Sequence, residues 1–375
     1  MLIHKLQQKL LARAESNSLR KLTTNKGLTD FFSNDYLGLA RNKALYEAIL
    51  LETEKVSANL NGSTGSRLLS GNHNYIIKLE EQLASLFHAE KTLLFNSGYN
   101  ANLSILSAIP QKGDTIIYDE LIHASLKDGA RLSFANRFSF RHNDVVDLEL
   151  KLQKATGEKF VVIESVYSMD GDFAAMNEII LVCKKYNAYI ILDEAHSTGV
   201  YGKNGNGLAC SEGIENNFFA RIYTFGKGMG IHGACIAGSK ILIDYLVNYA
   251  RPFIYTTSLP AHSLASVKCA FEYLHQHPEL QKEIKSNIDF FKATIQFELG
   301  NDFKIISDSP IQVIKIAGNT EVKKISQGLK DKGFDVRPIL SPTVKEGEER
   351  LRICLHVFNT ETEIKNLIGS IKNLL

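Results

Sequence analysis

An acidic residue ends a strongly apolar segment of the chain, and a histidine follows it three positions later. Residues 189–196 read Tyr-Ile-Ile-Leu-Asp-Glu-Ala-His, so a strand-like run delivers Asp193 to its carboxyl end. A carboxylate placed there costs free energy unless it meets a positive partner, and a protonated pyridine nitrogen is one that fits. His196 would then reach a phenolic oxygen on the same ring. The alternative is that Asp193 caps a helix and His196 lies in a surface turn.

A lysine flanked by glycines follows another expected strand. Residues 222–230 read Ile-Tyr-Thr-Phe-Gly-Lys-Gly-Met-Gly, which places Lys227 in a turn with little steric hindrance. A lysine forms an imine with an aldehyde once desolvation or a neighbouring cation lowers its pKa. Thr224, near the same turn, could donate to a phosphate. Most lysines are solvated surface charges, so Lys227 gains weight because Asp193 precedes it by about one βαβ unit.

Two more strand-end turns carry polar groups suited to a flat, phosphorylated ligand. Residues 95–102 read Phe-Asn-Ser-Gly-Tyr-Asn-Ala-Asn, so the backbone at Gly98 and Tyr99 could form a phosphate cradle at a helix N-terminus. A plain helix cap by Ser97 would look the same in sequence. His123, after the next expected strand, could stack on a heteroaromatic ring, although a lone histidine is more often structural.

The elements that position these residues alternate between short apolar runs and helical stretches. This alternation predicts an α/β fold with a mostly parallel central sheet, in which ligands collect at the carboxyl ends of the strands. Helices are expected at 75–87 and 177–186. The expected strands are 92–95, 115–118, 160–164, 189–193, 221–225 and 234–237.

The pattern changes after about residue 260. A helical stretch, broken near Pro278, leads into a smaller α+β segment with strands near 311–316 and 351–355 and a last helix from residue 361. The first 13 residues have an amphipathic helical pattern. We therefore expect an N-terminal helical arm (1–44), a large domain (45–269) and a small C-terminal domain (270–375).

The bulk composition excludes several classes of protein. The 375 residues include 43 basic and 41 acidic ones, and this near-balance gives no reason to expect nucleic-acid or membrane-surface binding. No apolar run approaches the roughly 20 residues that span a bilayer, so a cytoplasmic location is predicted. The five cysteines are scattered and form no CxxC pair, which favours reduced thiols over disulfides or a metal site.

Together these motifs resemble the α-oxoamine synthases, a family within the fold type I pyridoxal-phosphate (PLP) enzymes. The resemblance runs over nearly the whole chain and implies the fold of a PLP-dependent transferase. It rests on five segments: 33–39 (Ser-Asn-Asp-Tyr-Leu-Gly-Leu), 62–71 (Gly-Ser-Thr-Gly-Ser-Arg-Leu-Leu-Ser-Gly), 193–199 (Asp-Glu-Ala-His-Ser-Thr-Gly), 224–228 (Thr-Phe-Gly-Lys-Gly) and 351–353 (Leu-Arg-Ile).

The resemblance implies pyridoxal 5′-phosphate as the cofactor, held by Lys227 as a Schiff base. Lys227 would also move the substrate Cα proton, Asp193 would pair with the pyridinium, and His123 would stack on the ring; these three are the expected catalytic residues. The expected cofactor-binding residues are Gly98, Tyr99, His123, Ser168, Asp193, His196, Thr224 and Lys227.

The resemblance also implies substrate contacts and a partner. Arg352 would bind the amino acid carboxylate in the bidentate geometry that guanidinium favours. Arg20 and Thr343 would line the path of the acyl substrate, and His123 would border it. A homodimer with shared active sites is expected, in which Thr256 and Thr257 reach a phosphate in the partner subunit.

Within the family the chain is most similar to members that condense L-alanine with a pimeloyl thioester, on CoA or acyl-carrier protein, in biotin biosynthesis. The strings at 34–39, 65–71, 165–172 and 338–344 favour this branch. The nearest rival is a glycine C-acetyltransferase. An aminotransferase shares the fold and the Asp–Lys pair, and a non-catalytic subunit would lack the lysine. The chain departs from the family at 354–359 and at His232, whose role the sequence leaves open.

Overall fold

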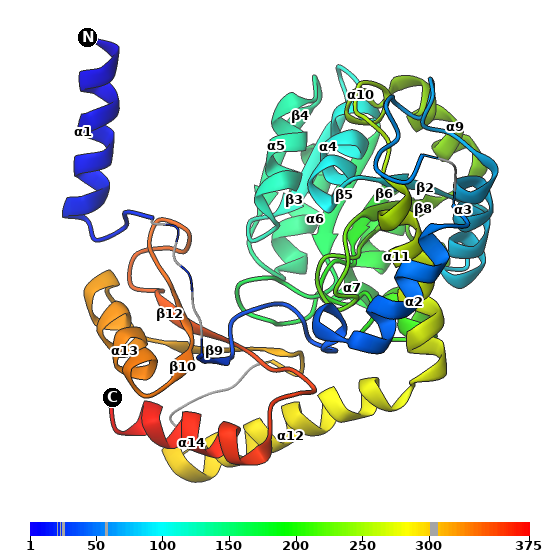
Figure 1. The fold of residues 1–375 in the computed structure, drawn as a ribbon. Coiled ribbons are helices and arrows are strands. Elements are labelled where there is room, and N and C mark those ends of the chain that lie inside the picture. The colour runs from blue at the N-terminus through cyan, green and yellow to red at the C-terminus, as the bar shows by residue number, and fades with distance from the viewer. Residues whose placement is uncertain (21, 23, 25–26, 57–58, 301–306) are drawn as a thin grey trace. The chain divides into compact units, whose positions relative to one another are not determined.

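The computed structural model describes residues 1–20, 22, 24, 27–56, 59–300 and 307–375, and it divides into two compact units (Figure 1). The large unit comprises Asn34–Ser168 and Phe173–Lys282. The small unit comprises Met1–Ser33, Met169–Asp172 and Glu283–Leu375. The division into an arm and two domains at residues 44/45 and 269/270 remains a prediction.

A seven-stranded sheet forms the centre of the large unit, in the order β2-β8-β7-β6-β5-β3-β4 (Figure 1). Neighbouring strands are parallel except at β8, which runs antiparallel to both β2 and β7. The predicted mostly parallel α/β sheet is therefore confirmed. The strands are β2 (Lys91–Phe95), β3 (Thr115–Asp119), β4 (Asn136–Phe140), β5 (Lys159–Glu164), β6 (Ala188–Asp193), β7 (Ala220–Thr224) and β8 (Ala234–Gly238).

The central strands are continuous apolar runs because helices cover the sheet on both faces (Figure 1). Residues Val161, Val162 and Ile163 of β5 are fully buried, for example. The sequence missed β4, which forms one edge of the sheet. Four of its five residues are exposed, so it lacks the apolar signal of a buried strand.

The helices of the large unit follow the strands and place their N-termini at the carboxyl ends of β2 and β3. The break expected near Pro278 separates α11 from α12, which starts at Glu279 and continues into the small unit. The helices are α2 (Lys43–Thr53), α3 (Asn74–Leu86), α4 (Gly98–Ala108), α5 (Ala124–Leu132), α6 (Val145–Lys154), α7 (Met176–Lys185), α8 (Gly207–Ser211), α9 (Lys240–Tyr249), α10 (Arg251–Ile254), α11 (Ala261–Gln276) and α12 (Glu279–Leu299), with short 3-10 turns at Leu39–Arg41, Lys203–Gly205 and Glu215–Asn217.

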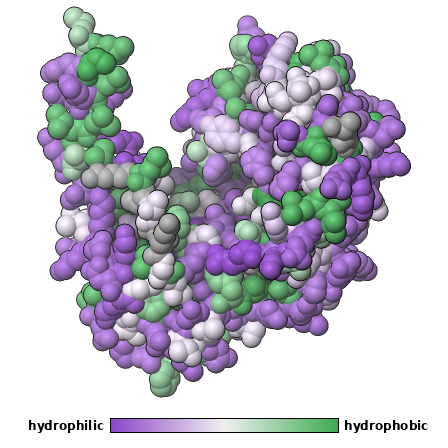
Figure 2. Space-filling view, viewed as in Figure 1, coloured by the Kyte–Doolittle hydropathy of each residue, from purple (hydrophilic) through white to green (hydrophobic). Residues whose placement is uncertain are grey.

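The small unit is built on an antiparallel sheet in the order β11-β12-β9 and a short parallel pair, β1 and β10. Its last helix starts at a capping box, in which Thr360 and Glu363 each satisfy a backbone N–H of the other. The N-terminal helix α1 buries none of its residues, and Figure 2 shows both hydrophobic and hydrophilic side chains on its surface. The elements are α1 (Leu2–Glu15), β1 (Thr29–Asp30), β9 (Ile311–Lys315), α13 (Asn319–Asp331), β10 (Phe334–Asp335), β11 (Arg337–Ile339), β12 (Arg350–Cys354) and α14 (Glu361–Lys372).

Membrane-spanning helices and metal-binding clusters are both absent from the described residues. None of the helices in these ranges is both long and apolar enough to cross a membrane. Across the same ranges, no group of three His, Cys, Asp or Glu side chains is arranged to hold a metal ion. All five cysteines are free thiols, and all but the half-buried Cys210 are buried.

Candidate active site

A cavity of about 250 Å³ opens at the carboxyl edge of the large sheet. It gathers residues from the turns after β2, β3, β6 and β7, which are the four turns singled out in the sequence. Its lining includes Gly98, Tyr99, His123, Asp193, Thr224, Lys227 and His232.

Lys227 lies three residues beyond β7, and its ammonium is placed by a relay of hydrogen bonds. The Tyr36 hydroxyl donates to Asn34 Oδ1 (3.0 Å), so it accepts from His196 Nδ1 (2.8 Å). Because Nδ1 of His196 carries the ring proton, Nε2 is unprotonated and accepts a hydrogen bond from Lys227 Nζ, 2.8 Å away. His196 is buried, which rules out the surface-turn alternative. His196 contacts Lys227, but it is not among the described residues that line the cavity.

Asp193 ends β6, and the donors that hold it among the described residues are neutral. Its Oδ2 accepts from Asn102 Nδ2 (2.8 Å) and its Oδ1 from the backbone N–H of Ala195 (2.9 Å). Asn102 also donates to Ser125 Oγ (3.0 Å), while its own Oδ1 is buried without a hydrogen-bond partner among the described residues. The Asp193 carboxylate is 3% exposed, and neither Lys nor Arg forms an ion pair with it in the described ranges.

A second carboxyl lies beside Asp193. Glu164 ends β5, and the parallel register places it directly opposite Asp193. Burial, followed by the negative charge of Asp193, raises the pKa of Glu164 to about 8. Glu164 accepts a hydrogen bond from the backbone N–H of His123. The protonated carboxyl therefore lines the cavity and holds the turn that carries His123.

His123 is kept neutral by its surroundings. Burial lowers its pKa, and the positive charge of Lys227 lowers it further. Its Nδ1 accepts from the backbone N–H of Ser125 (3.2 Å) and caps α5. The neutral ring consequently carries its proton on Nε2.

The turn between β2 and α4 leaves no room for a side chain at its glycine. Ser97 caps α4 by accepting from the backbone N–H of Asn100 (3.3 Å). A Cβ added at Gly98 would lie 2.4 Å from Cγ2 of Thr224, which ends β7. Gly98 and Tyr99 begin α4 and both line the cavity, the placement that a phosphate cradle at a helix N-terminus requires. The Tyr99 hydroxyl donates to Asp128 Oδ2 (2.5 Å).

The remaining expected residues lie outside this cavity. Ser168 is buried, but it is not among the described residues that line the cavity. In the small unit, Arg20 Nη2 donates to Thr343 Oγ1 (3.3 Å), so the two residues expected on the acyl path are brought together. Arg352 lies in the middle of β12 and donates to Cys354 Sγ (2.9 Å). The roles of these four residues remain predictions.

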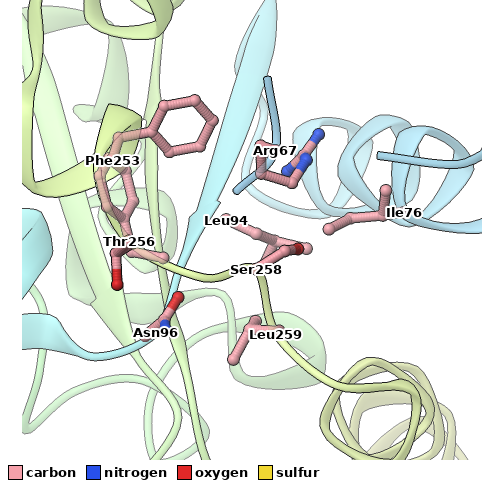
Figure 3. Close-up of a pocket in the computed structure, with 9 residues that line it drawn as sticks. Arg67, Ile76, Leu94, Asn96, Phe253, Thr256, Ser258 and Leu259 are labelled. Carbon is pink, nitrogen blue, oxygen red and sulfur yellow. The ribbon is translucent and has the colours of Figure 1, made fainter. Parts of the chain in front are cut away.

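Thr256 lines a separate, small cavity of about 10 Å³ in the large unit (Figure 3). Arg67 borders the same cavity, and its guanidinium forms a bidentate pair with Glu80 (2.7 and 3.0 Å). Thr257 is exposed, and its carbonyl accepts from Asn96 Nδ2 (2.9 Å). The expected contact of Thr256 and Thr257 with a phosphate of a partner subunit remains a prediction.

Sequence reasoning missed several residues of the site. Asn102 lies one helical turn after Gly98, so an i, i+4 search of α4 would have found it. Glu164 ends an apolar run just as Asp193 does, and the same strand-end rule applied to 160–164 would have found it. Tyr36 lies in segment 33–39, which carries the family resemblance, but the sequence assigned it no role, because its contact with His196 joins segments 160 residues apart.

Comparison with known proteins identifies the family. The family model for aminotransferase class I and II matches residues 26–371. The chain belongs to this family. It is 39% identical to an 8-amino-7-oxononanoate synthase from Marinobacter nauticus, over 92% of this chain and 87% of that one. It is 38% identical to the enzyme of the same name from Emericella nidulans, over 99% of this chain and 95% of that one. The expected resemblance to the α-oxoamine synthases is thus confirmed.

Solved structures agree with this placement. A serine palmitoyltransferase from S. paucimobilis with a bound PLP–myriocin aldimine superimposes with a TM-score of 0.89 and 26% identity, covering 99% of this chain and 96% of that one. An 8-amino-7-oxononanoate synthase from Francisella tularensis gives a TM-score of 0.80 and 28% identity, covering 93% and 98%. The predicted fold type I architecture is confirmed.

Proposed function

We propose that the protein is a PLP-dependent acyltransferase that condenses L-alanine with a pimeloyl thioester. The reaction forms the C–C bond of 8-amino-7-oxononanoate and releases carbon dioxide and a free thiol, in biotin biosynthesis. Curated relatives that share at least 38% identity and carry this name support it. The observation that carries the proposal is that Asp193, Lys227, His123 and Gly98 line one cavity.

The cavity fits pyridoxal 5′-phosphate on two observations. The buried Asp193 carboxylate is held by neutral donors, so a pyridinium nitrogen would supply the cation that it lacks. Gly98 and Tyr99, the first two residues of α4, line the cavity, so a helix N-terminus faces it, which suits a phosphate. Asp193, Gly98, Tyr99, Thr224 and Lys227 would hold the cofactor. When bound, it supplies an electron sink for the carbanion formed at the substrate Cα.

Lys227 and His196 provide the proton transfer. Nζ of Lys227 must lose a proton before it can remove one from the substrate Cα. His196 Nε2 accepts from that amine at 2.8 Å, and Tyr36 fixes the ring by accepting from Nδ1. His196 therefore orients Lys227 and takes up its proton.

His123 and Glu164 provide an uncharged donor. Because Ser125 N–H fixes Nδ1 as an acceptor, the Nε2–H of His123 is the group that would donate to the developing oxyanion of the thioester. Glu164 positions His123 through its backbone N–H. A neutral imidazole at this place avoids repulsion with the Lys227 ammonium.

The first experiment is a spectral titration of the cofactor-loaded protein. L-Alanine should change the visible absorbance of the cofactor, and pimeloyl-CoA should then release free thiol. In the variant Lys227→Ala the absorbance of the lysine-bound cofactor should be lost and turnover abolished. Unchanged turnover in that variant would overturn the proposal. If only glycine and acetyl-CoA reacted, the protein would be a glycine C-acetyltransferase.

We further propose a cytoplasmic homodimer with shared active sites. The family resemblance supports it, because the residues expected to complete a partner's phosphate site, Thr256 and Thr257, lie outside the cavity of their own chain. Light scattering of the loaded protein should give twice the mass of the 41.8 kDa chain. A monomer that retains full turnover would contradict it.

A further inference from the structure

A groove of about 470 Å³ crosses the surface of the small unit along α13. The helix buries Val322, Ile325 and Leu329 against the unit, which leaves the opposite face to solvent. That face lines the groove with Lys323, Lys324 and Lys330. None of these residues belongs to the cofactor cavity.

The positive charge of the groove is not neutralised within the chain. In the described ranges, no carboxylate forms an ion pair with Lys323, Lys324 or Lys330. Lys323 donates to the backbone carbonyl of Asn17, a neutral acceptor. The acidic residue of the lining, Asp335, is paired with Arg337 (2.8 Å).

The acids of α13 itself do not cancel this charge. Asp331 accepts from Gln327 Nε2 (2.7 Å) rather than from a lysine, and Glu321 lies in the first turn of the helix. The groove therefore presents a net positive row. From Lys323 to Lys330 the row extends about 10 Å along the helix axis.

The groove is continuous with the segments expected to guide the acyl substrate. Asn17 Nδ2 donates to Thr320 Oγ1 (3.1 Å), and Asn319 Nδ2 donates to the carbonyls of Ser16 (3.0 Å) and Ser341 (3.3 Å). Asn17 and Pro338 line the groove, and they belong to the stretches 16–20 and 338–343 that carry Arg20 and Thr343.

We propose that this basic groove docks the acidic surface of an acyl-carrier protein that delivers the pimeloyl group. The inference rests on the proposed function and names the form of its acyl donor. Phosphates of CoA are best bound by donors that converge on one point. Cations spaced along two turns of a helix instead complement a row of carboxylates on a protein partner, which steers its association.

The test compares two donors on the cofactor-loaded protein, pimeloyl-CoA and pimeloyl-carrier protein, with L-alanine. The variant Lys324→Glu/Lys330→Glu reverses two exposed charges of the groove. The control variant Lys78→Glu/Lys112→Glu makes the same change at exposed positions of the large unit. Unfolding curves establish that all the proteins are folded.

We expect the groove variant to raise KM for the carrier-linked donor about tenfold, since charges at an interface act chiefly on association. Its kcat, its kinetics with pimeloyl-CoA and the control variant should be unchanged. For the wild type, kcat/KM with the carrier should fall as salt is added, and the groove variant should lose much of this dependence.

Equal losses with both donors would overturn the carrier assignment in favour of CoA phosphates. No change with either donor would overturn the docking site altogether. A wild-type protein that turns over neither donor would overturn the proposed function instead. In that case calorimetry would still test the docking site, by comparing the binding of the carrier protein to the wild type and to the groove variant.

Discussion

At the scale of single residues, the pair Glu164 and Asp193 determines how the site responds to pH. The two carboxyls are neighbours in register at the ends of β5 and β6, and both are buried. Two adjacent buried carboxylates cannot both be charged at low cost, so one keeps its proton. The raised pKa of Glu164 identifies it as that one.

This raised pKa predicts a pH-dependent stability. The ordinary pKa of the carboxyl is 4.5, and in the folded protein it is about 8. Between these values the folded state binds more protons than the unfolded state, so raising the pH favours unfolding. In Glu164→Gln, which keeps an acceptor for His123 N–H, the free energy of unfolding of the apoprotein should fall less between about pH 5 and about pH 8. Urea denaturation at several pH values measures the free energy of unfolding. The same dependence on pH in the wild type and in Glu164→Gln would contradict the prediction.

The lowered pKa of His123 gives a second prediction. Part of the shift comes from the positive charge of Lys227, while burial, the larger cause, stays in place when that charge is removed. Lys227→Met should therefore raise the pKa of His123 in the apoprotein, toward its ordinary value. NMR titration of labelled histidine reads this directly. Lys112→Met, in an exposed turn, is the control that should leave it unchanged.

The sequence predicted those site residues that end strands and missed those placed by contacts between elements. Asp193, Lys227, His123 and Gly98 were found because parallel strands end at one edge of a sheet. The pairing of Glu164 with Asp193 depends on register, and the relay from Lys227 to Tyr36 depends on tertiary packing. The spacing of residues within one segment predicts neither the pairing nor the relay.

At the scale of elements, the start of α4 and the end of β7 approach too closely for any side chain larger than hydrogen. Gly98→Ala places a Cβ 2.4 Å from Thr224 Cγ2 and must displace one element. Overpacking of this kind costs about 1–3 kcal/mol, so we expect cofactor affinity to fall by about tenfold or more.

A second substitution should restore the affinity. Thr224→Ser removes the methyl group and keeps the hydroxyl, so Gly98→Ala/Thr224→Ser should bind the cofactor more tightly than Gly98→Ala alone. Equilibrium titration of the apoproteins with pyridoxal phosphate measures both, with Thr224→Ser as the control. A double variant as weak as the single one would show that the contact with Thr224 is not the cause.

The elements themselves were predicted unevenly. The buried strands and the break before α12 have strong local signals: apolar runs and a proline. The edge strand β4 forms because its backbone pairs with β3, and its exposed side chains carry no apolar pattern. The sequence does not predict such a strand, because hydrogen bonding to a neighbouring strand depends on both segments and leaves no pattern in either one alone.

At the scale of the whole molecule, the chain leaves the large unit for only four residues, Met169–Asp172, and returns. Within the small unit Asp170 pairs with Arg350 of β12, and both side chains are buried. Arg350→Met would leave the Asp170 carboxylate buried without its cation, which costs about 3–5 kcal/mol.

The companion change should recover most of that loss. Arg350→Met/Asp170→Asn removes both charges, so it should denature at a higher urea concentration than Arg350→Met. Arg131→Met, which breaks an exposed pair with Asp128, is the control and should change stability little. If the single and double variants were equally unstable, lost packing rather than the stranded charge would be the cause.

The strand order of the large sheet also determines at which point of synthesis the cofactor site can be completed. β2 is an edge strand whose sole described neighbour in the sheet is β8, which leaves the ribosome more than a hundred residues later. Because synthesis adds about 5–20 residues per second, the apolar β2 has no strand partner for on the order of ten seconds. Until β7 and β8 fill the space between β6 and β2, neither the phosphate turn nor Lys227 has its neighbours. A nascent chain halted before β8 would therefore need chaperone protection and would carry no cofactor, so cofactor loading marks a chain that has been made at least through β8.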